Sequence, residues 1–325
     1  MWVFTEEEIR DAVALNVATV DGVEKGFSAL VEGRVRMPPI LRVDIPEHRG
    51  EVDVKTAVVE GEPFFAVKMS SGFFDNPKRG LASGSGLMVL LDVETGLPEA
   101  ILLDNGLLTD LRTAAAGAVA ARHLARDQMT TAGVIGAGSQ ARYQIRSLAL
   151  VRRFDRILVW SRNKQRAEAC AQELAAEIGV PAEVAPDTET VVKRSDVVIT
   201  STPATRPLIQ KEWLHEGLHL TAMGSDAEHK QEIEGAAIAA VDRFVCDSRQ
   251  QSLRLGELRA AVAEGWIDER ESITELGEIT ASCTPGRRSE EEITLCDLTG
   301  TGVQDTVIAV MAYRRLREQG KGTRI

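Results

Sequence analysis

The sequence has few aromatic residues, no paired cysteines and no metal-ligand motif. Phe, Trp and Tyr make up 4% of the 325 residues, so we expect Ala, Val, Leu and Ile to fill the core. The four cysteines form no C-x-x-C pair, and the five histidines show no H-E-x-x-H or similar spacing. These absences argue against a disulfide framework and against a zinc site, and we predict that the chain binds no metal.

Long apolar runs and an excess of positive charge are absent as well. The chain has no run of about 18 apolar residues that could span a membrane. Its acidic N-terminal segment lacks the apolar core of a signal peptide. The formal net charge of −11 repels the phosphates of nucleic acids and of anionic lipids. We therefore expect a soluble, cytoplasmic protein with no nucleic-acid partner and no membrane partner.

The composition that remains is typical of a globular chain. Hydrophobic residues make up 44% and charged residues 27%, and 325 residues are enough for two domains with separate cores. Residues 1–125 are predicted to form an α+β domain, with helices near residues 5–15 and 20–32. The strands that follow have no helix between them, which indicates an antiparallel or mixed sheet. They are expected at residues 51–59, 63–69, 86–93 and 99–104.

From residue 126 onward, short apolar strands alternate with helices. This alternation predicts a parallel sheet covered on both faces, so residues 126–302 form a Rossmann-type doubly wound domain and the fold class is α/β. A last helix, near residues 302–319, is expected to return to the first domain, which residues 303–325 complete. The expected strands are 131–135, 156–160, 196–200, 218–223 and 243–247, and the main helices are 109–125, 139–151 and 163–178.

A glycine-rich loop joins the first strand of the alternating run to its helix. The pattern is Gly136-x-Gly138-x-x-Ala141, in which the glycines allow a tight turn and a close approach to a pyrophosphate. The helix start supplies N–H groups and the positive end of its dipole. Two other glycine-rich stretches, residues 83–86 and 299–302, are not placed between a strand and a helix of the alternating run. The residues predicted to bind a nicotinamide dinucleotide are Gly136, Ala137, Gly138, Ser139 and Gln140.

The end of the second strand bears on the choice of dinucleotide. An NAD site usually places Asp or Glu about 20 residues after the loop, where it accepts a hydrogen bond from the ribose. This sequence has Ser161 and Arg162 there, and a hydroxyl with a guanidinium suits a 2′-phosphate. NADP(H) is therefore the preferred cofactor and NAD(H) the alternative. Arg162 could instead belong to the solvated start of the next helix.

Three polar residues outside the loop have the chemistry that an amino acid substrate needs. Lys68 lies on an apolar strand, where it either holds an anion or extends from a strand edge into water. Arg112 begins an apolar helix and is either an anion clamp or half of a structural ion pair. Asp226 follows a parallel strand at the end where α/β sheets bind ligands, although it could also cap a loop. Redox chemistry at an α-carbon needs such cations and such a proton-transfer group.

These residues and their surroundings resemble the ornithine cyclodeaminase/mu-crystallin family. The resemblance is closest to the branch linked to ectoine utilisation, on residues 51–57, 72–77 and 223–230. Family members are typically homodimers, and their first domain, completed by the C-terminal helix, binds the substrate and forms the interface. The matching stretches are residues 65–69, 111–116, 134–141, 197–203, 222–230 with Glu232, 275–278 and 297–305.

The resemblance also implies roles for individual residues. Arg42, Lys68 and Arg112 correspond to residues that hold the substrate carboxylate, and Lys68 can also polarise the reacting centre. Asp226 matches the catalytic aspartate, which handles the protons of the amine. Positions that line the cofactor in the family are matched by Ser83, Thr113, Thr202, Met223 and Gly224.

The resemblance leaves several activities open. The main interpretation is an NAD(P)-dependent enzyme that acts at the α-carbon of a small amino or imino acid, as a cyclodeaminase or as a reductase of cyclic ketimines such as pyrroline-2-carboxylate. Cyclodeaminases bind the distal amine with a glutamate, and Glu51, Asp53 and Lys55 do not align cleanly with it. The residues after the second strand resemble mu-crystallin, whereas Asp226 resembles the cyclodeaminases and alanine dehydrogenases. The alternatives are an alanine dehydrogenase-like enzyme and a non-catalytic, NADPH-dependent ligand binder.

Overall fold

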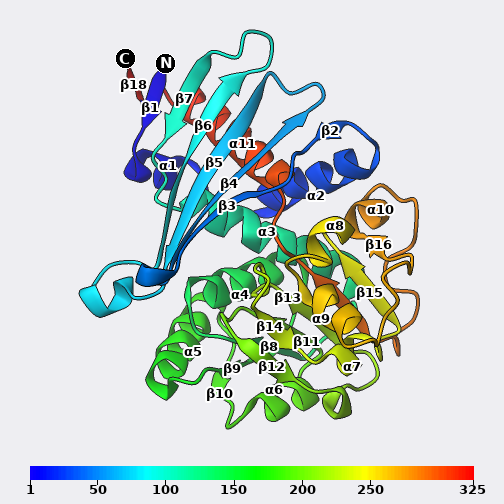
Figure 1. The fold of residues 1–325 in the computed structure, drawn as a ribbon. Helices are drawn as coiled ribbons and strands as arrows, with labels where there is room; N and C mark the ends of the chain where they lie inside the picture. Colours follow the sequence, from blue (N-terminus) through cyan, green and yellow to red (C-terminus); the bar gives the residue numbers. More distant parts are fainter. The chain divides into compact units, whose positions relative to one another are not determined.

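The computed structural model describes residues 1–325 and divides them into two compact units (Figure 1). The first unit consists of Met1–Arg112 and Thr301–Ile325, and the second of Thr113–Gly300. The sequence-based limits, at residues 125 and 302, stay a prediction for the domain boundaries. The α/β fold class is confirmed, because the second unit contains a parallel sheet with helices between its strands.

The first unit is built on one mixed sheet. Its strand order is β18-β1-β7-β6-β5-β4-β2, and β3 also pairs with β4. All pairs are antiparallel except β1 with β7. The strands are β1 (Trp2–Phe4), β2 (Val35–Arg36), β3 (Leu41–Ile45), β4 (Gly50–Val59), β5 (Phe64–Phe73), β6 (Gly84–Asp92), β7 (Pro98–Leu102) and β18 (Thr323–Arg324).

The first two helices of the first unit begin at side-chain caps. The Thr5 hydroxyl accepts from the N–H of Glu8, whose carboxylate accepts from the N–H of Thr5, so the two residues form a capping box. The Asn16 side chain caps the second helix in the same way. The helices are α1 (Glu6–Ala12), α2 (Val17–Val31), α11 (Gly302–Glu318) and the short helices η1 (Pro46–His48) and η2 (Asn76–Arg79); α3 (Leu107–Leu124) continues into the second unit.

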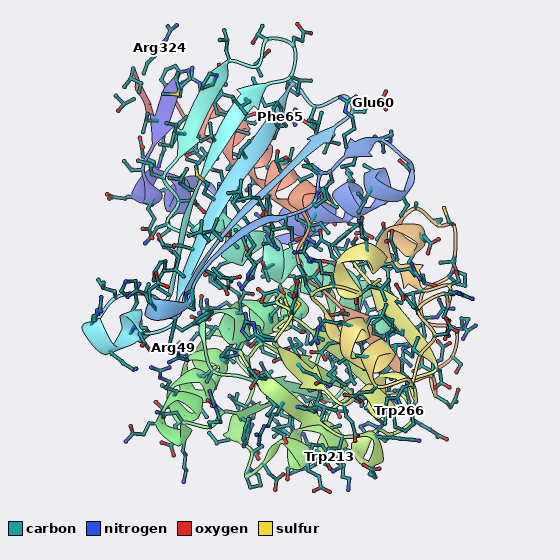
Figure 2. All side chains as sticks on the ribbon, in the orientation of Figure 1. Arg49, Glu60, Phe65, Trp213, Trp266 and Arg324 are labelled. Carbon is teal, nitrogen blue, oxygen red and sulfur yellow. The ribbon has the colours of Figure 1, made fainter.

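The two faces of the first sheet differ. Helix α11 packs against β4 and β5 and against α2, so Ala66, Met88 and Leu90 are buried on this side. Side chains alternate along a strand, and the opposite side carries residues such as Phe65, which Figure 2 labels on β5. We call this side the open face; the aligned apolar residues on it are Leu41, Val43, Val52, Val54, Val67, Met69, Leu87, Val89 and Ile101.

The second unit contains a fully parallel sheet. Its order is β10-β9-β8-β11-β13-β17-β15-β16, and apolar clusters lie on both faces. The strands are β8 (Thr131–Ile135), β9 (Arg156–Trp160), β10 (Ala182–Val184), β11 (Val197–Thr200), β13 (His219–Ala222), β15 (Arg243–Cys246), β16 (Thr274–Glu275) and β17 (Thr294–Asp297), with β12 (Thr205–Ile209) and β14 (Gln231–Ile233) as a separate pair. The helices are α4 (Ser139–Val151), α5 (Lys164–Ile178), α6 (Thr188–Arg194), α7 (Gly235–Ile238), α8 (Arg249–Ser252), α9 (Glu257–Ala263), α10 (Leu276–Thr280) and η3 (Lys211–Trp213).

One expectation about the second sheet is wrong. Strand β17 lies between β13 and β15, and the sequence did not predict it. The glycine-rich residues 299–302 therefore connect a parallel strand to a helix, α11, instead of lying outside such a context. Strand β17 is short and follows a run of charged residues, which hides its apolar character in the sequence.

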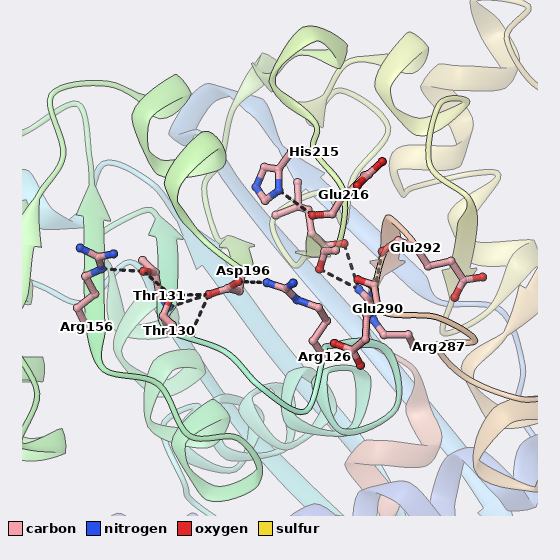
Figure 3. A network of polar contacts seen from close by, with 12 residues as sticks. Arg126, Thr130, Thr131, Arg156, Asp196, His215, Glu216, Arg287, Glu290 and Glu292 are labelled. Carbon is pink, nitrogen blue, oxygen red and sulfur yellow. Dashed lines mark hydrogen bonds and ion pairs between the residues drawn. The ribbon is translucent and has the colours of Figure 1, made fainter.

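A polar network closes the N-terminal edge of this parallel sheet (Figure 3). The carboxylate of Asp196, just before β11, accepts from the backbone N–H groups of Thr130 and Thr131, at 2.8 and 2.9 Å, and pairs with Arg126. Nearby, Arg287 donates to backbone oxygens that include those of Leu124 and Glu292. These hydrogen bonds satisfy backbone N–H and carbonyl groups at the edge of the sheet opposite to the carboxyl ends of the strands.

The structure also bears on membrane and metal binding. No helix is both long and apolar enough to cross a membrane. No group of three or more His, Cys, Asp or Glu side chains is arranged to hold a metal ion. All four cysteines are free, and three of them are buried.

Candidate functional site

The loop between β8 and α4 has the geometry that the glycine pattern predicts. Gly136 has φ +131°, and a Cβ there would lie 2.6 Å from the Ser201 hydroxyl oxygen and 2.9 Å from its carbonyl oxygen. A Cβ on Gly138 would have no protein atom within 4 Å, and no side chain caps the start of α4. The loop is thus open where a phosphate can approach the first turn of the helix.

The residues predicted to read the ribose lie at the next strand end. Strand β9 pairs in parallel with β8, and the Gly136 N–H donates to the Trp160 carbonyl at 2.8 Å. Ser161 and Arg162 follow directly, so they lie at the same edge of the sheet as the glycine loop. Arg162 is exposed, and the N–H of Asn163 donates to the Ser161 hydroxyl at 3.4 Å.

A buried carboxylate fixes two further residues predicted to line the cofactor. Glu232 accepts from the N–H and the hydroxyl of Thr202, both at 2.7 Å, and from the N–H of Gly224 at 2.8 Å. Burial raises the pKa of Glu232, although these hydrogen bonds oppose the rise. Met223 is held by its N–H, which donates to the Thr200 carbonyl. Glu232 therefore ties the loop after β11 to the loop after β13.

Thr113 and Ser83 occupy different settings. Thr113 lies on α3 in the second unit, and its carbonyl accepts from the Gln144 side chain of α4 at 2.9 Å. Ser83 lies just before β6 in the first unit, is exposed, and its carbonyl accepts from the N–H of Phe73 at 2.7 Å. None of these contacts involves a ligand, so the cofactor roles of Thr113 and Ser83 stay predictions.

Asp226 lies on the loop that follows β13. Its carboxylate accepts from the Lys230 ammonium at 2.5 Å. The Asp226 side chain is 40% exposed and that of Lys230 only 8%. The loop is anchored by the buried Ser225 hydroxyl, which donates to the carbonyls of Lys230 and Leu255. The prediction that Asp226 lies at the carboxyl edge of the sheet is confirmed, whereas its partner Lys230 was not predicted.

In the first unit, Lys68 and Arg112 meet at one carboxylate. The Lys68 Nζ lies 3.0 Å from Asp305 Oδ2, and the Arg112 Nε lies 2.9 Å from Asp305 Oδ1. The exposed fractions of the three residues are 1%, 6% and 0%. Lys68 is on β5, Arg112 on α3 and Asp305 on α11, so three segments far apart in the sequence form this buried group.

The burial of this group shifts its proton equilibria. Burial lowers the pKa of Lys68 to about 7; Asp305 opposes the shift, while Arg112 and Lys55 add to it. Burial also raises the pKa of Asp104, just before α3, to about 6, although Lys68 and backbone N–H groups oppose this rise. Despite its burial, the pKa of Asp305 is held below its ordinary value by the neighbouring cations. Lys68 can therefore gain or lose a proton near neutral pH.

Arg42 lies on the same face of the sheet but has acidic partners of its own. It pairs with Asp44 at 2.9 Å, with Glu51 at a shorter distance and with Asp53 at 3.7 Å. Glu51, Asp53 and Lys55 alternate along β4, and Lys55 is aligned with Lys68 on β5. The structure does not join Arg42 to the group around Asp305, so its role toward a substrate carboxylate stays a prediction.

Sequence reasoning found the cations of the first unit but not the groups that hold them. It assigned no role to Asp305, Glu232 or Lys230, although all three lie in or beside stretches that resemble the family. A signal was available for Asp305, because an aspartate in an apolar, buried helix needs a partner. The partner could not be named, since it is far away in the sequence.

Comparison with known proteins agrees with this geometry. A model described as the ornithine cyclodeaminase/mu-crystallin family matches residues 2–320, and the chain belongs to this family. A putative dehydrogenase of Rhizobium meliloti (strain 1021) is 51% identical over 99% of this chain and 98% of its own length. The family resemblance seen in the sequence is thereby confirmed.

Two solved structures are similar over the whole chain. One is the Delta(1)-pyrroline-2-carboxylate reductase of Thermococcus litoralis in complex with NADH and L-proline, with a TM-score of 0.95, 29% identity and 100% of both chains covered. The other is an archaeal alanine dehydrogenase dimer with bound NAD, with a TM-score of 0.92 and 30% identity over 100% of this chain and 98% of that one.

Proposed function

We propose that this chain is an NAD(P)-dependent oxidoreductase that acts at the α-carbon of a small amino or imino acid. The observation that carries the proposal is the convergence of two buried cations, Lys68 and Arg112, in a family whose members include the reductase and the dehydrogenase named above. Cations of this kind bind a substrate carboxylate, and a guanidinium can do so with two hydrogen bonds.

The residues divide the chemistry between them. The nicotinamide, when bound, accepts or donates the hydride. Lys68 and Arg112 hold the substrate carboxylate, and the Lys68 ammonium can protonate or polarise the reacting centre, since its pKa is about 7. Asp226 takes or returns the proton of the amine. The glycine loop fits a nicotinamide dinucleotide, because it leaves open space for the pyrophosphate beside Gly138 at the start of α4.

The proposed cofactor preference is NADP(H) over NAD(H). It rests on Ser161 and Arg162 alone, since the two similar structures carry NADH and NAD. We expect Arg162→Ala to raise the dissociation constant of NADPH at least about tenfold, because one charge-assisted bond to the 2′-phosphate is lost, and to change that of NADH little. Fluorescence titration with both dinucleotides measures this difference. Equal losses would refute the assignment of Arg162.

A cyclodeaminase is the second candidate. It is favoured by Glu51 and Asp53, which lie on the same face of the first sheet as Lys68, where a carboxylate can bind a distal amine. Arg42 pairs with both of them, so this amine would have to compete with a guanidinium. An open-chain amino acid dehydrogenase and a non-catalytic ligand binder stay alternatives, and the link to ectoine utilisation stays a prediction.

Turnover tests the proposal directly. The purified chain is offered pyrroline-2-carboxylate with NADPH or NADH, alanine with NAD, and ornithine with NAD. The first two reactions are followed by the absorbance of the reduced nicotinamide, and the reaction of ornithine is followed by the release of ammonia, because cyclodeamination returns the hydride to the product. We expect Asp226→Asn to reduce kcat at least about a hundredfold, which is the lower range for loss of a general acid–base group. Glu228→Gln is the control, since this exposed carboxylate lies in the same loop. Tight dinucleotide binding without turnover of any amino or imino acid would favour the ligand binder.

We further propose that the chain is a homodimer formed through the open face of the first sheet. No helix of the first unit covers this face, although its aligned side chains are apolar. A second copy offers the same apolar surface, as a two-fold interface requires. The similar alanine dehydrogenase is described as a dimer.

A further inference from the structure

Asp305 uses both oxygens of one carboxylate, each toward a different cation. Oδ2 lies 3.0 Å from the Lys68 ammonium, and Oδ1 lies 2.9 Å from Nε of Arg112. The outer guanidinium nitrogen Nη1 of Arg112 donates to the Gln304 side chain at 2.8 Å. The two cations are therefore oriented by neighbouring residues of a single helix, α11.

The helix itself is fixed against the sheet at the next residue. The Thr306 hydroxyl donates to the Ala57 carbonyl on β4 at 2.7 Å and accepts from the Ala66 N–H on β5 at 3.0 Å. Gly302 approaches the backbone of Thr56 so closely that a Cβ has no room. These bonds add to the ion pairs of Asp305 in holding α11 against β5, the strand that carries Lys68.

The charges around Lys68 come from four segments. Asp305 on α11 and Asp104 before α3 are negative, whereas Arg112 on α3 and Lys55 on β4 are positive. Burial and the positive charges of Arg112 and Lys55 favour the neutral form of the Lys68 amine. Asp305, which contacts the Lys68 ammonium directly, favours the protonated form. Without the negative charge of Asp305, Lys68 would lose its proton at a lower pH, and the buried group would then contain one cation fewer.

We propose that Asp305 is the positioning residue of the reaction site in the first unit: it orients Lys68 and Arg112 toward a substrate carboxylate and keeps Lys68 protonated while both are buried. This inference rests on the proposed function and adds to it a group that need not touch substrate. It also explains why a carboxylate that neutralises part of the cationic charge lies at a site for anions.

The test is the pH dependence of Asp305→Asn, which removes the charge and keeps the shape. The pH profile of kcat/KM falls on the basic side as Lys68 loses its proton. We expect this limb to move at least about one pH unit toward acid in Asp305→Asn, because an opposite charge within contact distance raises a pKa by that amount or more. We expect KM to rise about tenfold or more above neutral pH, with a smaller change in kcat.

Thr306→Val is the matched control. It removes two buried hydrogen bonds of the same helix and no charge, so it should lower the melting temperature and leave the basic limb where it is. If both variants move the limb equally, or neither moves it, the assignment of Asp305 is overturned. If Asp305→Asn does not fold, Asp305→Glu is measured instead. A basic limb at the wild-type pH together with a raised KM supports the positioning role of Asp305. Wild-type values of both kcat and KM contradict that role.

Binding of L-proline, a carboxylate probe, separates failure of this inference from failure of the proposed function. Calorimetry with the NADH-loaded protein should show that Asp305→Asn weakens L-proline binding more at about pH 8 than at about pH 6, since the pKa of Lys68, about 7, lies between these values. If the wild type turns over but Asp305→Asn keeps the same basic limb of the pH profile and the same affinity for L-proline, only the role of Asp305 is overturned. A wild-type protein with neither turnover nor L-proline binding overturns the proposed function.

Discussion

At the scale of single residues, two glycines of the dinucleotide loop meet different requirements. Gly136 is needed by the protein itself, since its φ is +131° and a Cβ would collide with Ser201. Gly138 has an ordinary extended backbone and free space where its Cβ would stand. Any selection against a side chain at Gly138 therefore acts through a ligand and not through folding.

Alanine substitutions separate these requirements. Gly138→Ala should melt like the wild type without cofactor and bind NADPH and NADH about tenfold or more weakly, because the methyl group occupies the path of the pyrophosphate. Gly136→Ala should melt at a lower temperature even without cofactor, since positive φ costs a non-glycine residue about 1 kcal/mol or more. Thermal melting and dinucleotide titration check both variants. Unchanged affinity in Gly138→Ala would contradict the assignment of the loop.

The residue types of the site could be predicted from the sequence, but their partners could not. A lysine in an apolar strand, an arginine in an apolar helix and an aspartate after a parallel strand are each unusual enough to stand out. The pairing of Lys68 and Arg112 through Asp305 depends on how α11 packs on the sheet, and Gln304 and Arg112 alone are 192 positions apart. Contacts of that range carry no local sequence signal, so they became visible only in the structure.

At the scale of helices and strands, prediction followed the strength of the local pattern. Strands β8 and β9 and helices α4 and α5 were expected within a residue of their observed bounds, because apolar periodicity and caps agree there. Strands β1, β3 and β17 were missed. Each is three to five residues long, and only tertiary pairing with neighbouring strands selects the extended form.

The hydrogen bonds of Asp196 join the starts of β8 and β11 and should contribute to the stability of the fold. We expect Asp196→Asn to lower the free energy of unfolding by about 2 kcal/mol at neutral pH, because two backbone N–H groups and Arg126 lose a charged acceptor. Chemical denaturation measures the difference. Glu183→Gln, which removes the same charge from an exposed position on β10, is the control and should change stability little.

The same network gives stability a pH dependence of defined sign. Burial alone would raise the pKa of Asp196, but hydrogen bonds from Thr130 and Thr131 and the charge of Arg126 hold it below the ordinary value of 3.8. A carboxyl with a depressed pKa stabilises the fold above its unfolded pKa and loses that contribution as the pH falls through the folded pKa. The difference in the free energy of unfolding between the wild type and Asp196→Asn should therefore become smaller below about pH 4. A gap that widened in acid would contradict this account.

At the scale of the whole molecule, the open face of the first sheet predicts the assembly. We expect Val43→Asp, on this face, to convert a dimer into a monomer, because a charge there has to be buried against apolar side chains of the second copy. Sedimentation velocity over a range of concentrations measures the species. Leu97→Asp is the control, since Leu97 is exposed at the turn between β6 and β7, outside this face. Dimers that persist in Val43→Asp would place the interface elsewhere.

The place of Asp305 after the second unit in the chain has a consequence for biosynthesis. On the ribosome, residues 113–300 emerge in one continuous stretch, so the second unit has all its strands before the first unit has its last helix. Until α11 is released, the first sheet lacks the helix that packs on β4 and β5, and Lys68 and Arg112 lack their counterion. Two cations without a counterion are not stably buried. The nascent first unit therefore keeps them hydrated, and the anion site is completed only after α11 has been released and packs on the sheet.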